Sequence, residues 1–281
     1  MWGIMGLFVR ALTSAGLTSF QISGVRSLLT AILLIPVLLI ISPSLFRIKL
    51  KDLWCFLGTG ILSITFFNCC YFFAINEVTI SVAAILLYTA PIFVCILSAV
   101  FFKEKLTKQK LLALFVCTIG CVLVTDVFFS DAKISVIGLL TGLGSGLGYA
   151  LYSIFSRAAI NRGYNTFTIL FYTFLFSSLS LFFIVDFSPV FKMVTDGSFP
   201  WGYAILQATV STVIPYLIYT LGLKYTENST ASIIASTEPV VATLAGLIVF
   251  NEVPSLPSAI GIVLVLSAIA LLNVKGRKEQ I

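Results

Sequence analysis

Long apolar stretches alternate with short polar ones along most of this chain. Each has the length of about 18 residues or more that an α-helix needs to cross a hydrocarbon core of roughly 30 Å. The stretches lie at about 20–42, 53–75, 79–102, 109–126, 134–158, 166–187, 202–224, 229–250 and 256–274. The pattern therefore predicts an all-α membrane fold with nine full transmembrane helices.

A tenth apolar segment, at residues 1–12, is shorter and contains Arg10. At 1.5 Å per residue it reaches only about 18 Å, too little to cross the membrane. We interpret it as a first helix that lacks its cytoplasmic half, through a misplaced start codon or a natural truncation. A signal peptide is the alternative, but its basic start and small-residue cleavage site are absent from Met-Trp-Gly-Ile.

The sequence contains an internal duplication. Residues 71–104 match residues 219–252 without a gap, at an offset of 148. The residues that recur are Tyr71, Ser81, Ala83, Ile85, Thr89, Pro91, Phe102 and Glu104. Such a period marks a repeat architecture. It predicts a first repeat over 1–126, a second repeat over 134–274 and a basic tail at 275–281.

The composition indicates the medium of this repeat. Hydrophobic residues make up 59% of the chain and charged residues 10%, with a mean hydropathy of +1.10. A soluble surface cannot be built from this composition. We therefore expect a multi-pass protein of the plasma membrane, with the lipid bilayer as its main partner.

The basic residues predict the orientation. Lys and Arg accumulate in short cytoplasmic loops, and 13 of the 17 lie in alternate loops or in the tail. These are Arg47, Lys49, Lys51, Lys103, Lys105, Lys108, Lys110, Arg157, Arg162, Lys224, Lys275, Arg277 and Lys278. Both termini are then cytoplasmic. This bias and contact with anionic lipid account for the net charge of +6, so no nucleic-acid partner is expected.

Five spans in each repeat place the second copy upside down relative to the first. Inverted repeats allow two equivalent gates around a site at the midplane, which is the basis of alternating access. We therefore expect a secondary transporter of a small-molecule substrate. The alternatives are an intramembrane enzyme and a purely structural or lipid-scrambling bundle.

Several motifs carry a resemblance to a known family. They are Trp2-Gly3 with Phe8-Val9-Arg10, Arg26, Thr89-Ala90-Pro91, Thr237-Glu238-Pro239, Phe102-Lys103-Glu104 and Phe250-Asn251-Glu252. On these motifs the chain resembles the drug/metabolite transporter superfamily, with two EamA-type repeats. The resemblance implies ten helices as two inverted five-helix repeats, a central cavity and secondary transport. The shortened first helix departs from this pattern.

Polar residues that differ between the repeats are the candidates for chemistry. Glu238 stands where the first repeat has Ala90, about nine residues into its span, and an ionisable group at that depth is a functional hypothesis. It shares a helical stripe with small residues, so it should face the bundle interior. We expect it to bind a coupling proton or a cationic group. The alternative is a structural tie to backbone groups freed by Pro239.

Arg26, opposite Thr173 in the second repeat, is the other candidate. It shares one polar face of its helix with Ser19, Ser23 and Thr30, and a guanidinium can hold a carboxylate in two hydrogen bonds. If Arg26 and Glu238 both line the cavity, an amino acid or related zwitterion becomes the expected substrate. A structural role for Arg26, or snorkelling to the headgroups, is the alternative.

Prolines and tyrosines within the spans complete the candidate site. Pro91 and Pro239 lie near the middle of their spans, where proline kinks a helix, and we predict paired hinges there. Buried tyrosine hydroxyls need partners, and we expect some of these residues to line the cavity. The tyrosines are Tyr88, Tyr149, Tyr152, Tyr216 and Tyr219.

Other chemistry is not supported by the sequence. There is no histidine to hold a metal or to activate Ser145, and the six cysteines all lie in predicted spans as small apolar residues. The glycines at 138–148 lack the Gly-Lys-Ser/Thr of a phosphate loop. No cofactor or bound metal is expected. Glu104 and Glu252, at helix ends, are interpreted as scaffold residues that cap or pair.

Overall fold

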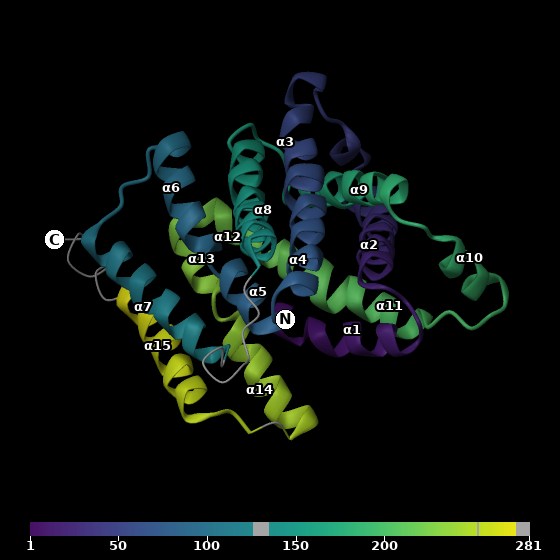
Figure 1. Ribbon diagram of the computed structural model, residues 1–281. Helices are drawn as coiled ribbons and strands as arrows, with labels where there is room; N and C mark the ends of the chain where they lie inside the picture. Colours follow the sequence, from purple (N-terminus) through teal and green to yellow (C-terminus); the bar gives the residue numbers. More distant parts are fainter. Residues whose placement is uncertain (126–134, 252, 274–281) are drawn as a thin grey trace.

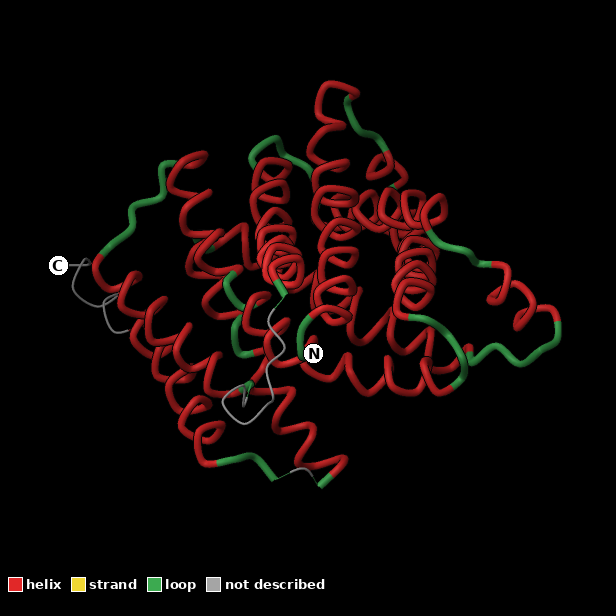
Figure 2. The backbone as a smooth tube through the Cα atoms, viewed as in Figure 1, coloured by secondary structure: helices red, strands yellow, loops and turns green. Residues whose placement is uncertain are grey.

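The computed structural model describes residues 1–125, 135–251 and 253–273. Within these residues the chain is helical, with short connecting loops and no strand (Figure 2). Residues 126–134, which contain the predicted boundary between the two repeats, Glu252, residue 274 and the predicted basic tail lie outside the described residues.

The first half contains five predicted spans. A short 3₁₀ turn, η1 (Trp2–Ile4), leads into α1 (Met5–Ser14) and then α2 (Ser19–Ile41). The third span begins after the 3₁₀ turns η2 (Pro43–Phe46) and η3 (Leu50–Asp52), and comprises α3 (Leu53–Leu57), a π-turn η4 (Gly58–Thr65) and α4 (Phe66–Glu77). The fourth span is divided into α5 (Ile80–Leu87) and α6 (Ala90–Phe102), and the fifth is α7 (Lys108–Val124).

The second half repeats this order. It begins with α8 (Val136–Ile160) and α9 (Thr166–Ile184), followed by a short helix α10 (Ser188–Thr195). The next span comprises α11 (Trp201–Ala208), a π-turn η6 (Thr209–Val213) and α12 (Ile214–Tyr225). The following span is divided into α13 (Asn228–Ala235) and α14 (Glu238–Phe250), and α15 (Leu256–Asn273) ends the described chain.

All nine apolar stretches predicted as full spans are helical, and their ends lie within a few residues of the predicted ones. Seven helical runs among the described residues are long and apolar enough to cross a membrane, and 256–272 is a shorter apolar helix. The total of ten transmembrane helices stays a prediction. The short amphipathic helix α10 was not predicted. At its start, Ser188 donates hydrogen bonds to Asp186 in the preceding loop, which lower the pKa of that carboxyl group.

Helix boundaries recur at the offset of the sequence repeat. Adding 148 to the bounds of α4, α5 and α6 gives those of α12, α13 and α14. Lys103 and Asn251, which end α6 and α14, are both left-handed, with φ of 57° and 55°. The duplication therefore extends to the backbone conformation.

The two divided helices break in the same way. Each break is followed by a Pro in the first turn of the next helix, α6 or α14. The N–H groups of a first turn have no partner within the helix, so the N–H that proline lacks costs no hydrogen bond there. Thr89 donates from its amide and hydroxyl to the Leu86 carbonyl at 3.2 and 2.6 Å. Thr237 donates to the Ile234 carbonyl at 3.2 and 3.0 Å. Both spans are thus broken directly before the turn that contains Pro91 or Pro239, and the paired hinges stay a prediction.

The helices pack around α8, which lies near the middle of the molecule and contacts α4, α5 and α6 (Figure 1). The long α2 packs against α9, with α1 and α11 beside them. At the opposite edge α7 and α15, one from each half, lie side by side.

The approach of α7 to α15 depends on two glycines. A Cβ added to Gly120 would lie 2.9 Å from the Gly261 carbonyl oxygen, and one added to Gly261 would lie 2.6 Å from the Gly120 carbonyl oxygen. Ala113 and Ala268, which are fully buried, belong to the same cluster. Small residues at such a contact allow membrane helices to pack backbone to backbone.

We expect Gly120→Ala to lower stability by about 1–3 kcal/mol, because the added methyl group meets backbone atoms that cannot move aside. The loss is measured as a lower melting temperature of the purified protein in detergent. Gly202→Ala is the control, since an added Cβ there meets nothing within 4 Å. Equal melting temperatures for the two variants would contradict the prediction.

Candidate functional site

Glu238 is the first residue of α14, directly after the helix break. The free N–H groups and dipole of a helix N-terminus favour a carboxylate at this position. The side chain is half-buried and borders two cavities. It forms no hydrogen bond or ion pair with another side chain of the described residues, although the N-terminal ammonium lies within electrostatic range. The structural alternative, a tie to backbone groups freed by Pro239, is not seen in the described chain.

Three adjoining cavities lie in this region, and two of them border the Glu238 carboxylate. The largest, of about 350 Å³, is bordered by Trp2, Tyr219, Ala235 and Glu238 among others. A second, bordered by Tyr88, Pro91 and Tyr149, shares Ala235 and Glu238 with the first. The third shares Tyr149 with the second and Trp2 and Tyr219 with the first.

A cluster of aromatic side chains lines the third cavity and extends to the other two. Trp2 lies at the centre, with its ring 5.0 Å from that of Tyr216, 5.6 Å from Tyr219 and 6.1 Å from Tyr149. Tyr152 packs edge-on against Tyr216 at 5.0 Å. We call these five aromatic residues together with Tyr88 and Glu238 the tyrosine chamber. It combines apolar faces with hydroxyl groups, as small-molecule sites commonly do.

Some of the polar groups in the chamber are satisfied and others are free. The Tyr152 hydroxyl pairs with Thr220 at 2.6 Å, and the Tyr219 hydroxyl pairs with Ser153 at 2.7 Å. The indole Nε1 of Trp2 is buried and has no hydrogen-bond partner among the described residues. A buried donor without a partner is costly, so a bound solute or water would stabilise this group.

Trp2 is held in place by the contact between η1 and α14. Gly3 lies so close to α14 that an added Cβ would be 2.7 Å from both the Ala242 amide nitrogen and the Glu238 carbonyl oxygen. The close approach sets the central aromatic ring beside the carboxylate. It joins the start of the first half to the broken helix of the second.

Arg26 lies on α2 and borders none of the three cavities. It is only 4% exposed, its Nη1 donates to the Met5 Sδ at 3.3 Å, and its Nε has no partner among the described residues. Ser23 Oγ and Thr30 Oγ1, on the same helix face, are also buried and without partners there. A buried guanidinium with one weak acceptor and no carboxylate is energetically unfavourable.

The structure brings most of the predicted site residues together. Glu238, Pro91 and the five predicted tyrosines each border at least one of the three cavities, and Pro239 follows Glu238 directly. The tyrosines are Tyr88, Tyr149, Tyr152, Tyr216 and Tyr219. Arg26 does not border them, but Tyr216 lies within electrostatic range of both Arg26 and Glu238.

Trp2 was not predicted as a site residue. The signal for it in the sequence is its alignment with Tyr149, at the offset of 147 that relates the first helices of the two repeats. Glu104 has the capping role assigned to it: its carboxylate accepts hydrogen bonds from the Asn228 and Ser229 amides at 2.8 and 3.2 Å.

Comparison with known proteins gives the family. The EamA-like transporter family matches residues 1–126 and 136–274. The chain belongs to this family. An uncharacterized transporter of Archaeoglobus fulgidus is 32% identical over 202 residues, covering 72% of this chain and 70% of its own.

A second transporter of that organism is 30% identical over 226 residues, covering 79% and 78% of the two chains. The uncharacterized transporter YetK of Bacillus subtilis is 23% identical, covering 93% and 80%. A solved crystal structure shares the fold with a TM-score of 0.78 at 17% identity, covering 100% of this chain and 95% of the other. Family membership and the apolar helices identify this EamA-family protein as a membrane transporter.

We expect Gly3→Ala to separate η1 from α14 and to displace Trp2 from the chamber. The measurement is tryptophan fluorescence: in a background with Trp54 and Trp201 replaced by Phe, the emission of Trp2 should shift to longer wavelength as the indole meets water. Gly6→Ala is the matched control, because an added Cβ at Gly6 meets nothing within 4 Å. An unchanged spectrum for Gly3→Ala would contradict this role.

Proposed function

We propose that this EamA-family protein is a secondary transporter that moves a small zwitterionic metabolite, such as an amino acid, by alternating access. Its ten helices form two inverted five-helix repeats in the plasma membrane, and both termini are cytoplasmic. The substrate site is the tyrosine chamber, where the two halves meet.

The observation that carries this proposal is a pair of charged side chains inside the bundle, the half-buried Glu238 and the buried Arg26, without charged side-chain partners among the described residues. Neither Glu238 nor Arg26 has an ion-pair partner among the described side chains, whereas the ion pairs of Lys110 and Arg162 lie at helix ends. A buried charge is retained only where something else neutralises it. A zwitterion would supply both partners, with its amine near Glu238 and its carboxylate directed towards Arg26, which lies outside the three cavities. Tyr216 lies within electrostatic range of both charged groups.

Glu238 also offers a coupling group. In this scheme a proton takes the place of the substrate amine on Glu238 when no substrate is bound, because a charge inside the membrane needs a neutralising partner. Exchange of the proton for the substrate amine would couple substrate movement to a proton gradient. No nucleotide enters this scheme, in keeping with the lack of a phosphate-loop motif in the sequence.

The broken helices supply the motion in this proposal. α5 and α6, and likewise α13 and α14, are joined by two residues at the level of the chamber. Irregular backbone within a membrane protein is tolerated where it borders a cavity, and such broken helices are sites where a transporter can move around its substrate.

The test is counterflow of radiolabelled amino acids in proteoliposomes. We expect saturable uptake by the wild type, and for Glu238→Gln and Arg26→Gln a loss of about thirtyfold or more in apparent affinity, since removing one buried charged partner costs about 2 kcal/mol or more. Asp196→Asn, an exposed loop change, is the control.

Counterflow of zwitterions that survives both Glu238→Gln and Arg26→Gln would remove these residues from the site. A wild type with no saturable counterflow of any small solute would favour a scaffold or a lipid-scrambling bundle, and hydrolysis of lipid or peptide by the wild type would favour an intramembrane enzyme.

A further inference from the structure

The largest cavity, of about 350 Å³, is bordered by α12 on one side and by α13 on the other. We call it the side groove. Along α12 it extends from Pro215 to Thr226, and the start of α14, with Glu238, also borders it. The residues that line it between these points are mostly apolar or small, among them Ile218, Gly222, Ala231 and Ile234.

The side groove opens sideways, into the part of the molecule that faces lipid. Ile218 is 58% exposed and Ile234 is 41% exposed, although both line the groove. They belong to the apolar runs Trp201–Tyr225 and Asn228–Val249, each long enough to cross a membrane. The medium at the opening is therefore hydrocarbon, which supplies no hydrogen bonds. Apolar atoms that line an empty space lose their dispersion contacts, so an apolar occupant is favoured.

The equivalent surface of the first half is covered by a helix. Cβ atoms added to two glycines of α8 would meet the side chains of Val78 and Leu86. At the repeat offset of 148 these two residues correspond to Thr226 and Ile234, which line the side groove. The described residues of the second half leave this surface open. The groove is thus a long, narrow space shaped for an elongated apolar body.

The length of the side groove matches one leaflet of a bilayer. Pro215 and Thr226 are eleven residues apart on one helix, which corresponds to about 16 Å at 1.5 Å per residue. The hydrocarbon core of a bilayer is roughly 30 Å thick, so half of it has nearly the same length. A single lipid acyl chain that lies along α12 would fill the groove from end to end.

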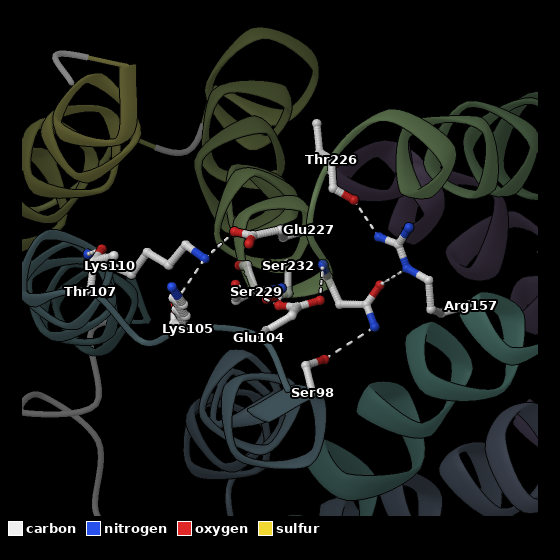
Figure 3. A network of polar contacts seen from close by, with 11 residues as sticks. Ser98, Glu104, Lys105, Thr107, Lys110, Arg157, Thr226, Glu227, Ser229 and Ser232 are labelled. Atoms are coloured by element: carbon white, nitrogen blue, oxygen red, sulfur yellow. Dashed lines mark hydrogen bonds and ion pairs between the residues drawn. The ribbon is translucent and has the colours of Figure 1, made fainter. Parts of the chain in front are cut away.

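Basic side chains lie at the end of the side groove that is marked by Thr226. Arg157, on α8, donates from Nη2 to the Thr226 carbonyl oxygen (Figure 3), and Lys224 is exposed two residues earlier in the chain. The nearby carboxylate of Glu227 is paired with Lys110. This end lies between two spans, at headgroup level, where Lys and Arg attract anionic lipid.

We propose that the side groove binds one acyl chain of an anionic phospholipid, with the lipid phosphate beside Lys224 and Arg157 and the end of the acyl chain directed towards the tyrosine chamber. The bound chain gives the second half the cover that α8 gives the first, on the side of the cavity where Ile218 and Ile234 are exposed. Such binding requires only that the protein is embedded in a membrane, so it is independent of the proposed transport.

The test is native mass spectrometry of the full chain in detergent micelles. The protein is titrated with phosphatidylglycerol and, separately, with phosphatidylcholine that has the same acyl chains. We expect one phosphatidylglycerol retained per chain, with an apparent affinity about fivefold or more above that for phosphatidylcholine, since each basic residue near a membrane surface contributes roughly that factor. Dimers in place of lipid adducts would assign the groove to a second copy of the chain and overturn the proposal.

Gly222→Leu places a side chain in the groove without a clash, because an added Cβ at Gly222 meets nothing within 4 Å. We expect it to weaken the binding of both lipids about tenfold or more, the factor for the loss of two buried methylene groups. Gly202→Leu is the matched control: an added Cβ at Gly202 also meets nothing within 4 Å, and this residue, on α11, does not line the groove. It should bind both lipids as the wild type does.

Lys224→Gln tests the headgroup end separately from the acyl chain. We expect it to lower the preference for phosphatidylglycerol about fivefold and to leave the affinity for phosphatidylcholine unchanged. Lys192→Gln, an exposed change on α10, is its control and should keep the preference.

Equal lipid retention by the wild type and Gly222→Leu would overturn the acyl-chain site, and a wild type without preference for phosphatidylglycerol would overturn the anionic headgroup. Counterflow measured on the same preparations reports on the proposed function separately, because neither Gly222 nor Lys224 belongs to the tyrosine chamber.

Discussion

A hydrocarbon interior offers no hydrogen-bond partners, and this constraint determines where the chain can depart from a regular helix. The breaks at 88–89 and 236–237 expose backbone groups that lipid could not satisfy. Thr89 and Thr237 donate to the carbonyl three residues earlier, and the breaks face the protein interior. In each π-turn a threonine does the same for the carbonyl five residues earlier: Thr65 for Gly60, and Thr212 for Gln207. Both breaks border the cavities, as do Ser63 and Ile64 of η4.

Much of this arrangement could be predicted from the sequence. The lengths of the apolar stretches predicted the helices, and Pro91 and Pro239, which recur at the repeat offset, lie directly after the helix breaks. The candidate site was found through residues that the repeat does not share, above all Glu238. Other features depend on contacts between the halves, which a single sequence does not encode locally. Trp2 becomes central only because Gly3 packs against α14. The π-helical segments η4 and η6 add one residue to a helical turn, and no residue type in the sequence marks them. Arg26 contacts Met5 because α1 packs against α2.

The symmetry of the molecule is broken at the two places where transport makes different demands. At the midplane the second repeat has Glu238 where the first has Ala90, so one broken helix presents a charge to the chamber and the other presents a methyl group. At the ends, Asn228 stands where the first repeat has Ile80. The scaffold residues Thr89, Pro91 and Glu104 keep their counterparts in the second repeat. Residues that the two repeats share therefore form the framework. Residues that differ place a carboxylate at the chamber, Glu238, and a buried amide at one end of the second half, Asn228.

The helix α13 connects these two asymmetric features. Asn228 and its cap Glu104 hold one end, and Ala235 at the other end borders the chamber two residues before the break that precedes Glu238. Eight residues of helix make a rigid rod of about 12 Å, so the two ends move together. Two cavities that contain Glu238 also contain Ala235, so a solute bound against the carboxylate would contact the same helix whose other end is held by Asn228 and Glu104. The short helix α13 would then couple its two ends directly, without a long pathway of side chains.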